Sequence, residues 1–223
     1  CEEETGKSVA IIGGGPMGLS AAYFLRRMGH DVTIFEAMPN AGGMLRYGIP
    51  EYRLPKAVLD EEILTIERMG VEIITNCKIG VDMPFETIRN DYDAVLLGIG
   101  AWVSTGVGCK GEDAEGVIGG IDFLRKVVRN EEIKLGEKVA IVGGGNTAMD
   151  ACRTAVRLGA KEVYNIYRRT KDEMPADMVE IEEAEEEGVI FKNLTNPIEV
   201  VADENGHVKE VVLQVMELGE PDA

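Results

Sequence analysis

A glycine-rich motif occurs twice in this chain, each time between a short apolar run and a segment with helical spacing. The first copy, G-x-G-x-x-G at residues 13–18, follows the apolar residues 8–12. The second copy, G-x-G-x-x-A at residues 143–148, follows the strand expected over residues 138–142. A glycine-rich turn at the start of a helix presents backbone N–H groups and the positive end of the helix dipole, which together bind phosphate. The repeat therefore predicts two dinucleotide sites, an arrangement typical of electron transfer between them.

The residues that follow the two motifs have the same order. After the first motif, helical spacing over residues 19–28 is followed by an apolar run over residues 32–35. After the second motif, a helix is expected over residues 146–158 and a strand over residues 163–167. Two such strand–loop–helix–strand units predict an α/β fold with two Rossmann-like dinucleotide-binding domains.

The glycines of the first motif have separate expected roles. Gly13 permits the tight turn, Gly15 lets the backbone approach a pyrophosphate, and Gly18 lets the helix pack closely on the strand. Pro16 lies at the start of the helix, where a missing N–H costs nothing. An acidic residue about 20 residues further on confirms such a site, because it binds the ribose hydroxyls. Glu36 has that place, so the first site is expected to prefer an unphosphorylated ribose.

The second motif keeps the first two glycines, Gly143 and Gly145, but has Ala148 in place of the third. Its strand also ends differently. Aligning Val32 with Val163 places Tyr167 opposite Glu36. The second site therefore has no carboxylate for a ribose hydroxyl.

Two arginines, Arg168 and Arg169, follow Tyr167 directly. Guanidinium groups bind phosphate well through forked N–H donors. The pair therefore predicts that the second site prefers a 2′-phosphate, as in NADP(H). An ordinary pair of surface arginines is the alternative interpretation.

Further motifs make the match to one family specific. They are residues 41–50 (AGGMLRYGIP), residues 94–101 (AVLLGIGA), and Tyr167-Arg168-Arg169 followed by Met174-Pro175. With the two glycine-rich loops and Glu36, this ordered set resembles the small (β) subunit of NADPH-dependent glutamate synthase. The same module occurs in dihydropyrimidine dehydrogenase and in the NADPH-side subunit of bifurcating ferredoxin oxidoreductases. The resemblance covers nearly the whole chain.

The resemblance implies FAD in the first site and NADPH in the second. It also implies hydride transfer from the nicotinamide to the flavin and onward transfer of electrons to iron–sulfur clusters. It assigns flavin-side contacts to Gly42, Gly43, Met44, Arg53, Gly100 and Ala101, and contacts with the NADPH pyrophosphate to Asn146 and Thr147. Because the cofactors carry this chemistry, no catalytic side chain is expected.

The expected organisation is a glutathione-reductase-like pair of domains, with FAD bound by residues 1–106 and NADPH by residues 107–223. Compared with the family, the chain lacks a cysteine-rich segment before the first strand. It also lacks a later Gly-Asp segment that completes the FAD domain and the last strand of the NADPH domain. We therefore expect a C-terminally truncated fragment. Iron–sulfur clusters would lie in the missing segment or in a partner, such as a larger catalytic subunit or an iron–sulfur protein.

Two further segments of the second domain have clear patterns. Residues 177–187 are strongly acidic and predict a helix with a solvated face. Near the C-terminus, Asn205-Gly206 lies between two runs rich in β-branched residues, which predicts a β-hairpin.

Composition excludes several classes of partner and site. The formal net charge of −17 argues against nucleic acid or an anionic membrane as a partner. No apolar run approaches the roughly 20 residues of a membrane span, and no signal peptide is visible, so a cytoplasmic protein is expected. The four cysteines, Cys1, Cys77, Cys109 and Cys152, are far apart, which predicts reduced thiols and no metal site.

Three functions remain open from the sequence. The first is a flavin-dependent NADPH oxidoreductase module of the glutamate synthase small-subunit type. The second is a non-catalytic dinucleotide-binding scaffold that docks a partner subunit. The third is a pyridine-nucleotide disulfide reductase, which shares the two-site architecture but needs a redox-active pair of cysteines beside the flavin.

Overall fold

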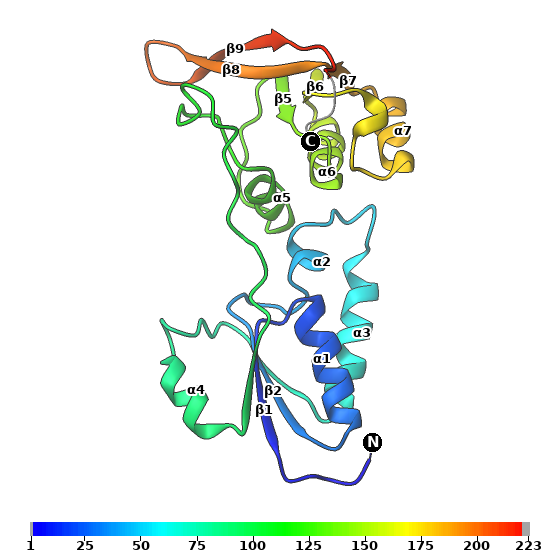
Figure 1. Ribbon diagram of the computed structural model, residues 1–223, viewed down its shortest axis with the longest axis vertical. Helices are drawn as coiled ribbons and strands as arrows, with labels where there is room; N and C mark the ends of the chain where they lie inside the picture. Colours follow the sequence, from blue (N-terminus) through cyan, green and yellow to red (C-terminus); the bar gives the residue numbers. More distant parts are fainter. Residues whose placement is uncertain (1, 220–223) are drawn as a thin grey trace. The chain divides into compact units, whose positions relative to one another are not determined.

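The computed structural model describes residues 2–219 of the chain and divides into two compact units after Trp102 (Figure 1). The sequence placed the domain boundary nearby, at residue 106. The two units are built on separate sheets, each of them parallel. The predicted α/β fold with two Rossmann-like units is therefore confirmed, while the assignment of one cofactor to each domain stays a prediction.

The first unit is a four-stranded parallel sheet in the order β3-β2-β1-β4. Its strands are β1 (Ser8–Ile12), β2 (Asp31–Phe35), β3 (Glu72–Ile74) and β4 (Ala94–Leu97). Its helices are α1 (Pro16–Arg27), α2 (Met44–Tyr47), α3 (Lys56–Arg68) and α4 (Phe85–Asp91). The chain returns from β1 through α1 to β2, which is the predicted βαβ unit.

Helices cover both faces of this sheet, which explains why its strands are apolar at successive positions. Ile11 on β1 and Ile34 on β2 are fully buried in the cluster that α1 and α3 complete. Ala10, the neighbour of Ile11, points to the opposite face, where Ile88 of α4 joins it. Figure 1 shows α1 and α3 on one side of the strands and α4 on the other.

The second unit has a three-stranded parallel sheet in the order β5-β6-β7. Its elements are α5 (Gly120–Val128), β5 (Lys138–Val142), α6 (Asn146–Arg157), β6 (Glu162–Tyr167), the 3-10 helix η1 (Lys171–Glu173), α7 (Met178–Glu186) and β7 (Ile190–Asn193). Among the described residues, β5 pairs only with β6, whereas β1 pairs with both β2 and β4.

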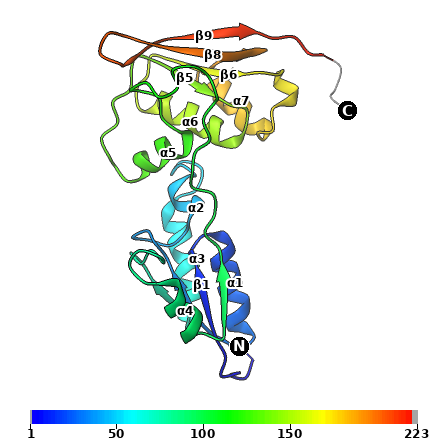
Figure 2. The same cartoon turned by 60° about the vertical axis from the view of Figure 1, so that its left-hand side comes forward.

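A separate antiparallel hairpin follows this sheet, formed by β8 (Thr195–Ala202) and β9 (Val208–Val215) (Figure 2). Its turn contains the Asn-Gly dipeptide that predicted a hairpin. Gly206 has a φ of +85°, a conformation that favours glycine.

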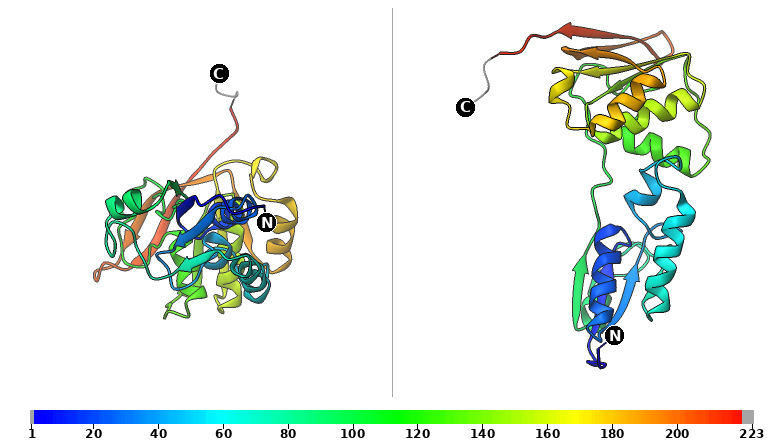
Figure 3. Two further views of the ribbon diagram at one scale, coloured as in Figure 1. Left: turned by 90° about the horizontal axis from the view of Figure 1, so that it is seen from below. Right: turned by 90° about the vertical axis from the view of Figure 1, so that its right-hand side faces the viewer.

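A buried arginine joins α6 to α7, so one face of the acidic helix is paired, while Glu182 and Glu186 are exposed as the sequence predicts. The Arg153 side chain is only 6% exposed, and its guanidinium lies 2.8 Å from Glu180, 2.5 Å from Glu183 and 2.8 Å from Glu187. Arg157 also pairs with Glu187. The two helices lie side by side in Figure 3. One face of the acidic helix is therefore held by an internal cation that lies distant in the sequence.

We expect Arg153→Met to lower the free energy of unfolding by about 3 kcal/mol, because it leaves a group of partly buried carboxylates without their cation. Urea unfolding followed by circular dichroism measures this change. Lys161→Met is the matched control, since Lys161 pairs with Glu137 on the exposed surface and such pairs contribute at most about 1 kcal/mol. Equal losses in the two variants would contradict the role of the buried cluster.

Candidate dinucleotide-binding sites

The first glycine-rich loop leaves the carboxyl end of β1 and is held by backbone on two sides. A Cβ atom added to Gly13, whose φ is +107°, would lie 2.3 Å from the carbonyl oxygen of Gly98. A Cβ added to Gly18 would lie 2.0 Å from the carbonyl oxygen of Gly13. No side chain fits at either position without a backbone shift, so both glycines are required by close packing.

The start of α1 is open to an anion. Gly15 is the N-cap residue, no side chain caps the helix, and Pro16 occupies its first turn. The first N–H groups of a helix have no partner within the helix, so an uncapped start can bind a phosphate. The loop that carries Gly42 and Gly43 lies against this point, because the Gly42 N–H donates to the carbonyl oxygen of Gly14 at 2.7 Å.

This contact between the loops also depends on the absence of side chains. Gly43 has a φ of +52°, and a Cβ there would lie 2.7 Å from the Cα of Gly15. A Cβ on Gly15 would have that same residue as its nearest neighbour, at 3.7 Å, so the space beside Gly15 is open. The structure therefore brings four predicted residues into one cradle: Gly13, Gly15, Gly42 and Gly43.

Glu36 lies at the end of β2, beside the loop, and is 5% exposed. Its carboxylate accepts hydrogen bonds from the backbone N–H of Gly14 at 2.7 Å and of Met38 at 2.8 Å. These two bonds fix the carboxylate next to the glycine-rich turn. Each carboxylate oxygen has two lone pairs, so both oxygens can still accept from ribose hydroxyls. The motif predicted that Glu36 binds a ribose, but it did not predict these hydrogen bonds from the backbone to the Glu36 carboxylate.

The remaining predicted residues of the first unit lie at the same edge of the sheet or in the loops that follow it. Met44 begins α2, directly after the Gly42-Gly43 turn, and Arg53 lies half-buried between α2 and α3. Gly100, with a φ of +66°, and Ala101 are exposed beyond the end of β4.

Sequence reasoning missed the part that Gly98 plays in the first loop. Its N–H donates to the carbonyl oxygen of Ile12 at 2.8 Å, which brings it over the loop. A Cβ on Gly98 would lie 3.0 Å from the sulfur of Met17. The glycine at the end of an otherwise apolar run was the signal that could have found it.

The second loop follows β5 in the same register as the first loop follows β1. The Gly13 N–H donates to the carbonyl oxygen of Phe35 at 2.8 Å, and the Gly143 N–H donates to that of Ile166 at 3.0 Å. Phe35 directly precedes Glu36, and Ile166 directly precedes Tyr167. The alignment of Tyr167 with Glu36 is therefore correct in the structure.

Tyr167 covers the second loop where the first loop has a carboxylate. A Cβ on Gly144 would lie 2.5 Å from the Tyr167 ring, and the Tyr167 hydroxyl donates to the carbonyl oxygen of Glu173 at 2.8 Å. The Gly144 carbonyl in turn accepts from the Ala176 N–H at 3.0 Å, much as the Gly14 carbonyl accepts in the first unit. The two loops thus share a backbone frame and differ in the side chain beside it.

Arg168 and Arg169 follow at the end of β6, and both are exposed. Within residues 2–219, neither guanidinium forms an ion pair with a carboxylate. Their charge is therefore available to an external anion. The arrangement fits a phosphate group better than it fits a ribose hydroxyl, because no carboxylate lies at the position equivalent to Glu36.

The start of α6 resembles the start of α1. Gly145 is its N-cap, with no side-chain cap, and a Cβ on Gly145 would meet nothing within 4 Å. Asn146 and Thr147 form the first turn and are followed by Ala148, which is 8% exposed. The Oδ1 of Asn146 accepts from the backbone N–H of Asp177 at 2.9 Å, which fixes this side chain beside the helix start.

The described cysteines offer no redox pair. Cys77, Cys109 and Cys152 are free thiols, and Cys77 and Cys152 belong to different hydrophobic clusters. Burial raises the pKa of Cys152 to about 12, although a hydrogen bond from Asn165 opposes this shift. Such a thiol stays protonated and unreactive. Cys1 lies outside the described residues.

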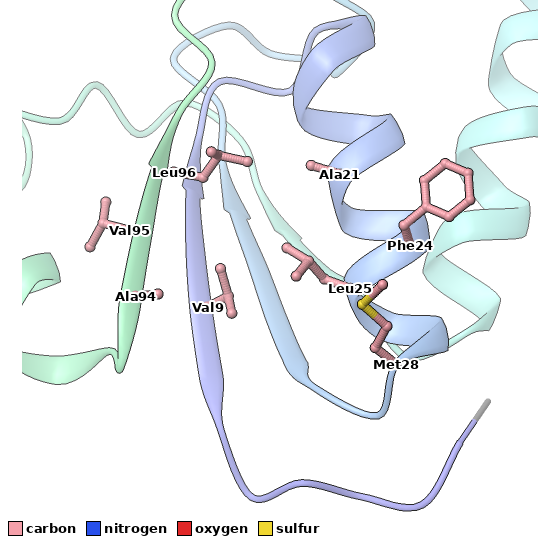
Figure 4. A pocket seen from close by; sticks show the side chains of 8 residues that line it. All are labelled: Val9, Ala21, Phe24, Leu25, Met28, Ala94, Val95 and Leu96. Atoms are coloured by element: carbon pink, nitrogen blue, oxygen red, sulfur yellow. The ribbon is translucent and has the colours of Figure 1, made fainter.

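An apolar pocket of about 370 Å³ lies between α1 and β4 of the first unit (Figure 4). The side chains that line it are Val9, Ala21, Phe24, Leu25, Met28, Ala94, Val95 and Leu96. With no charged or hydrogen-bonding side chain in its wall, it does not suit a dinucleotide. No helix in the described part of the chain is long and apolar enough to cross a membrane, and residues 2–219 contain no metal-binding group of His, Cys, Asp or Glu.

Gly18→Ala should lower the free energy of unfolding by about 2 kcal/mol, because the added methyl group would overlap the Gly13 carbonyl. Gly15→Ala should change it by less than about 0.5 kcal/mol, since that methyl group has space. Urea unfolding of the two variants beside the wild-type chain measures both changes. Similar stability of the two variants would show that α1 does not depend on this close approach.

Known proteins resemble this chain along nearly its whole length. The family model described as pyridine nucleotide-disulphide oxidoreductase matches residues 7–220. The NADP(+)-dependent formate dehydrogenase subunit beta of Moorella thermoacetica is 51% identical over 98% of this chain and 31% of its own length. The NADPH-Fe(3+) oxidoreductase subunit beta of Geobacter sulfurreducens (strain DL-1 / KN400) is 47% identical over 97% and 33%. The glutamate synthase (NADPH) small chain of Escherichia coli (strain K12) is 40% identical over 99% and 49%.

Solved structures share the fold at low sequence identity. FprA of Mycobacterium tuberculosis in complex with NADPH has a TM-score of 0.81 at 20% identity, over 93% of this chain and 63% of that one. Thioredoxin reductase of Lactococcus lactis has a TM-score of 0.71 at 20% identity, over 96% and 73%. The chain spans between 31% and 49% of the length of the three curated relatives above.

Proposed function

This chain belongs to the pyridine nucleotide-disulphide oxidoreductase family, and from that premise we propose that it is a flavin-dependent NADPH oxidoreductase module of the glutamate synthase small-subunit type. Membership implies binding of FAD and NAD(P)H. When bound, these cofactors would supply hydride transfer from the nicotinamide to the flavin and single-electron transfer to iron–sulfur clusters or a partner subunit. The residues of the chain would bind and orient them.

The observation that carries this proposal is the difference between two otherwise equivalent loops. Both loops present an uncapped helix start at the carboxyl end of a parallel strand. The first has the buried carboxylate of Glu36 beside it, and the second has Tyr167 followed by two arginines. A carboxylate repels a 2′-phosphate and accepts hydrogen bonds from ribose hydroxyls. A guanidinium group attracts the phosphate and donates hydrogen bonds to it. The asymmetry therefore favours FAD in the first site and NADPH in the second.

In the first site, the glycine cradle and the start of α1 would hold the FAD pyrophosphate, while Glu36 would orient the adenosine ribose. The proposed FAD residues are Gly13, Gly15, Pro16, Gly18, Glu36, Gly42, Gly43, Met44, Arg53, Gly100 and Ala101. In the second site, the start of α6 would hold the NADPH pyrophosphate. The proposed NADPH residues are Gly143, Gly145, Asn146, Thr147, Ala148, Arg168 and Arg169.

Partners are proposed from the relatives. Each relative described above is named as a subunit or chain, either beta or small. We place the iron–sulfur clusters outside this chain, in a larger catalytic subunit or an iron–sulfur protein. The net charge of −17 suits a partner with a basic surface.

A non-catalytic scaffold that binds nucleotides and docks a partner is the alternative function. The uncapped helix starts support it equally well, because they bind phosphate whether or not hydride moves. A disulfide reductase has less support, since Cys77 and Cys152 are buried in different clusters and Cys109 is remote from both in sequence.

Flavin absorbance separates the first two functions. We expect the purified chain, reconstituted with FAD, to show a flavin band that bleaches when NADPH is added without oxygen. Gly15→Ala is the control, because its methyl group would fill the space expected for the FAD pyrophosphate while leaving the fold intact. A chain that binds FAD but shows no bleaching with NADPH would favour the scaffold.

Arg168→Ala should weaken NADPH binding by about tenfold or more and leave NADH binding nearly unchanged, because a charge-assisted hydrogen bond to the 2′-phosphate is lost. Isothermal titration with each nucleotide measures both affinities. Arg129→Ala is the control, since Arg129 is an exposed arginine that pairs with Glu131. Equal weakening of NADPH and NADH by Arg168→Ala would contradict the assignment of the second site.

A further inference from the structure

A buried amide lies beneath the second glycine-rich loop. Asn165, on β6, is fully buried. Its Nδ2 donates to the carbonyl oxygen of Gly143 at 2.8 Å and lies 3.8 Å from the sulfur of Cys152. Its Oδ1 has no hydrogen-bond partner among the described residues. Burial of a half-paired amide is costly, so the bond to Gly143 is the interaction that offsets this cost.

The first loop has no such bond. The register places Ile34 of β2 at the position equivalent to Asn165, and Ile34 is fully buried and apolar. Apart from the bond from its N–H to the carbonyl oxygen of Phe35, Gly13 is confined by packing against backbone. The Gly98 carbonyl approaches it from β4, and Gly18 of α1 lies against its carbonyl oxygen.

The second loop lacks both packing contacts within the described residues. A Cβ on Gly143 would meet only the Ala148 methyl group within 4 Å, at 3.4 Å. No described strand pairs with the free edge of β5, and the methyl group of Ala148 stands where the first loop has a bare glycine. Gly143 also has a φ of +138°, against +107° for Gly13. Among the described residues, the second loop therefore has a side-chain hydrogen bond to its first glycine where the first loop has close backbone packing.

We propose that Asn165 is a positioning residue for the second dinucleotide site. Its amide fixes the Gly143 carbonyl and thereby the direction in which the chain turns into α6. This sets the N–H groups at Gly145 and at the start of α6 for the pyrophosphate. The inference rests on the proposed function of this loop, and it adds a contact that the glycine motif does not contain.

Asn165 acts on a part of the ligand that differs from the part bound by Arg168. The pyrophosphate is common to NADPH and NADH, whereas the 2′-phosphate belongs to NADPH alone. Loss of the amide should therefore weaken both nucleotides by the same factor and leave the preference between them unchanged. A contribution to stability alone would leave both dissociation constants unchanged at a temperature where the variant is fully folded.

We expect Asn165→Leu, which removes the amide at nearly constant volume, to raise the dissociation constants of NADPH and NADH together by about fivefold to tenfold. Isothermal titration of the whole chain at a temperature well below its unfolding midpoint measures both constants. Thr154→Val is the matched control, because it replaces a buried polar atom without a hydrogen-bond partner in the same unit. The control should bind both nucleotides as the wild-type chain does.

Unchanged affinities in a folded Asn165→Leu variant, or a loss confined to NADPH, would overturn the role of Asn165 while leaving the proposed function in place. A wild-type chain that binds neither nucleotide would overturn the proposed function, and the inference with it. If Asn165→Leu does not fold, the wild-type chain decides. The side-chain amide NMR signals of Asn165 should shift when NADPH saturates the site, and unshifted signals would overturn the proposal.

Discussion

The arrangement of the first unit depends on a close contact between the backbone of α1 and the end of β1, where Gly18 lies against the carbonyl oxygen of Gly13. A Cβ at Gly18 would come within 2.0 Å of that oxygen, so the start of α1 can reach the end of β1 only without a side chain. This closeness brings the uncapped N–H groups of α1 to the sheet edge where Glu36 and the Gly42-Gly43 turn also lie. The cradle proposed to hold a phosphate is thus a consequence of how closely a helix packs on a strand.

The second unit builds the same frame with different contacts. Ala148 replaces the third glycine, and within the described residues no strand flanks β5 on its free edge. A hydrogen bond from Asn165 takes over the hold on the first glycine. Beside the loop, the ring of Tyr167 lies where the other unit has a carboxylate. One supersecondary unit therefore carries two different sets of side chains at the strand end while its backbone hydrogen bonds stay the same, and the two nucleotide preferences that we propose rest on that difference.

The parts of the fold that follow from local pattern were predictable from the sequence. The two βαβ units were found because apolar runs, glycines and helical spacing recur in the same order, and the equivalence of Glu36 with Tyr167 holds because both strands have the same register. The helix over residues 177–187 was predicted, and Glu182 and Glu186 on it are exposed as expected, but its pairing with Arg153 was not foreseen. Arg153 lies on a different helix, and periodicity does not show which helices pack together.

The sequence by itself determined that two glycine-rich turns connect parallel strands to helices, and that an acid follows one turn and two arginines follow the other. These features are local, since each depends on residues that lie within one short strand–loop–helix–strand segment of the sequence. Only the tertiary structure decided that Glu36 binds the N–H of Gly14, that Gly98 confines Gly13, and that Asn165 reaches Gly143. Each of these contacts joins residues from different elements. Strand pairing brings these residues together, and their separation along the chain does not show that they are in contact.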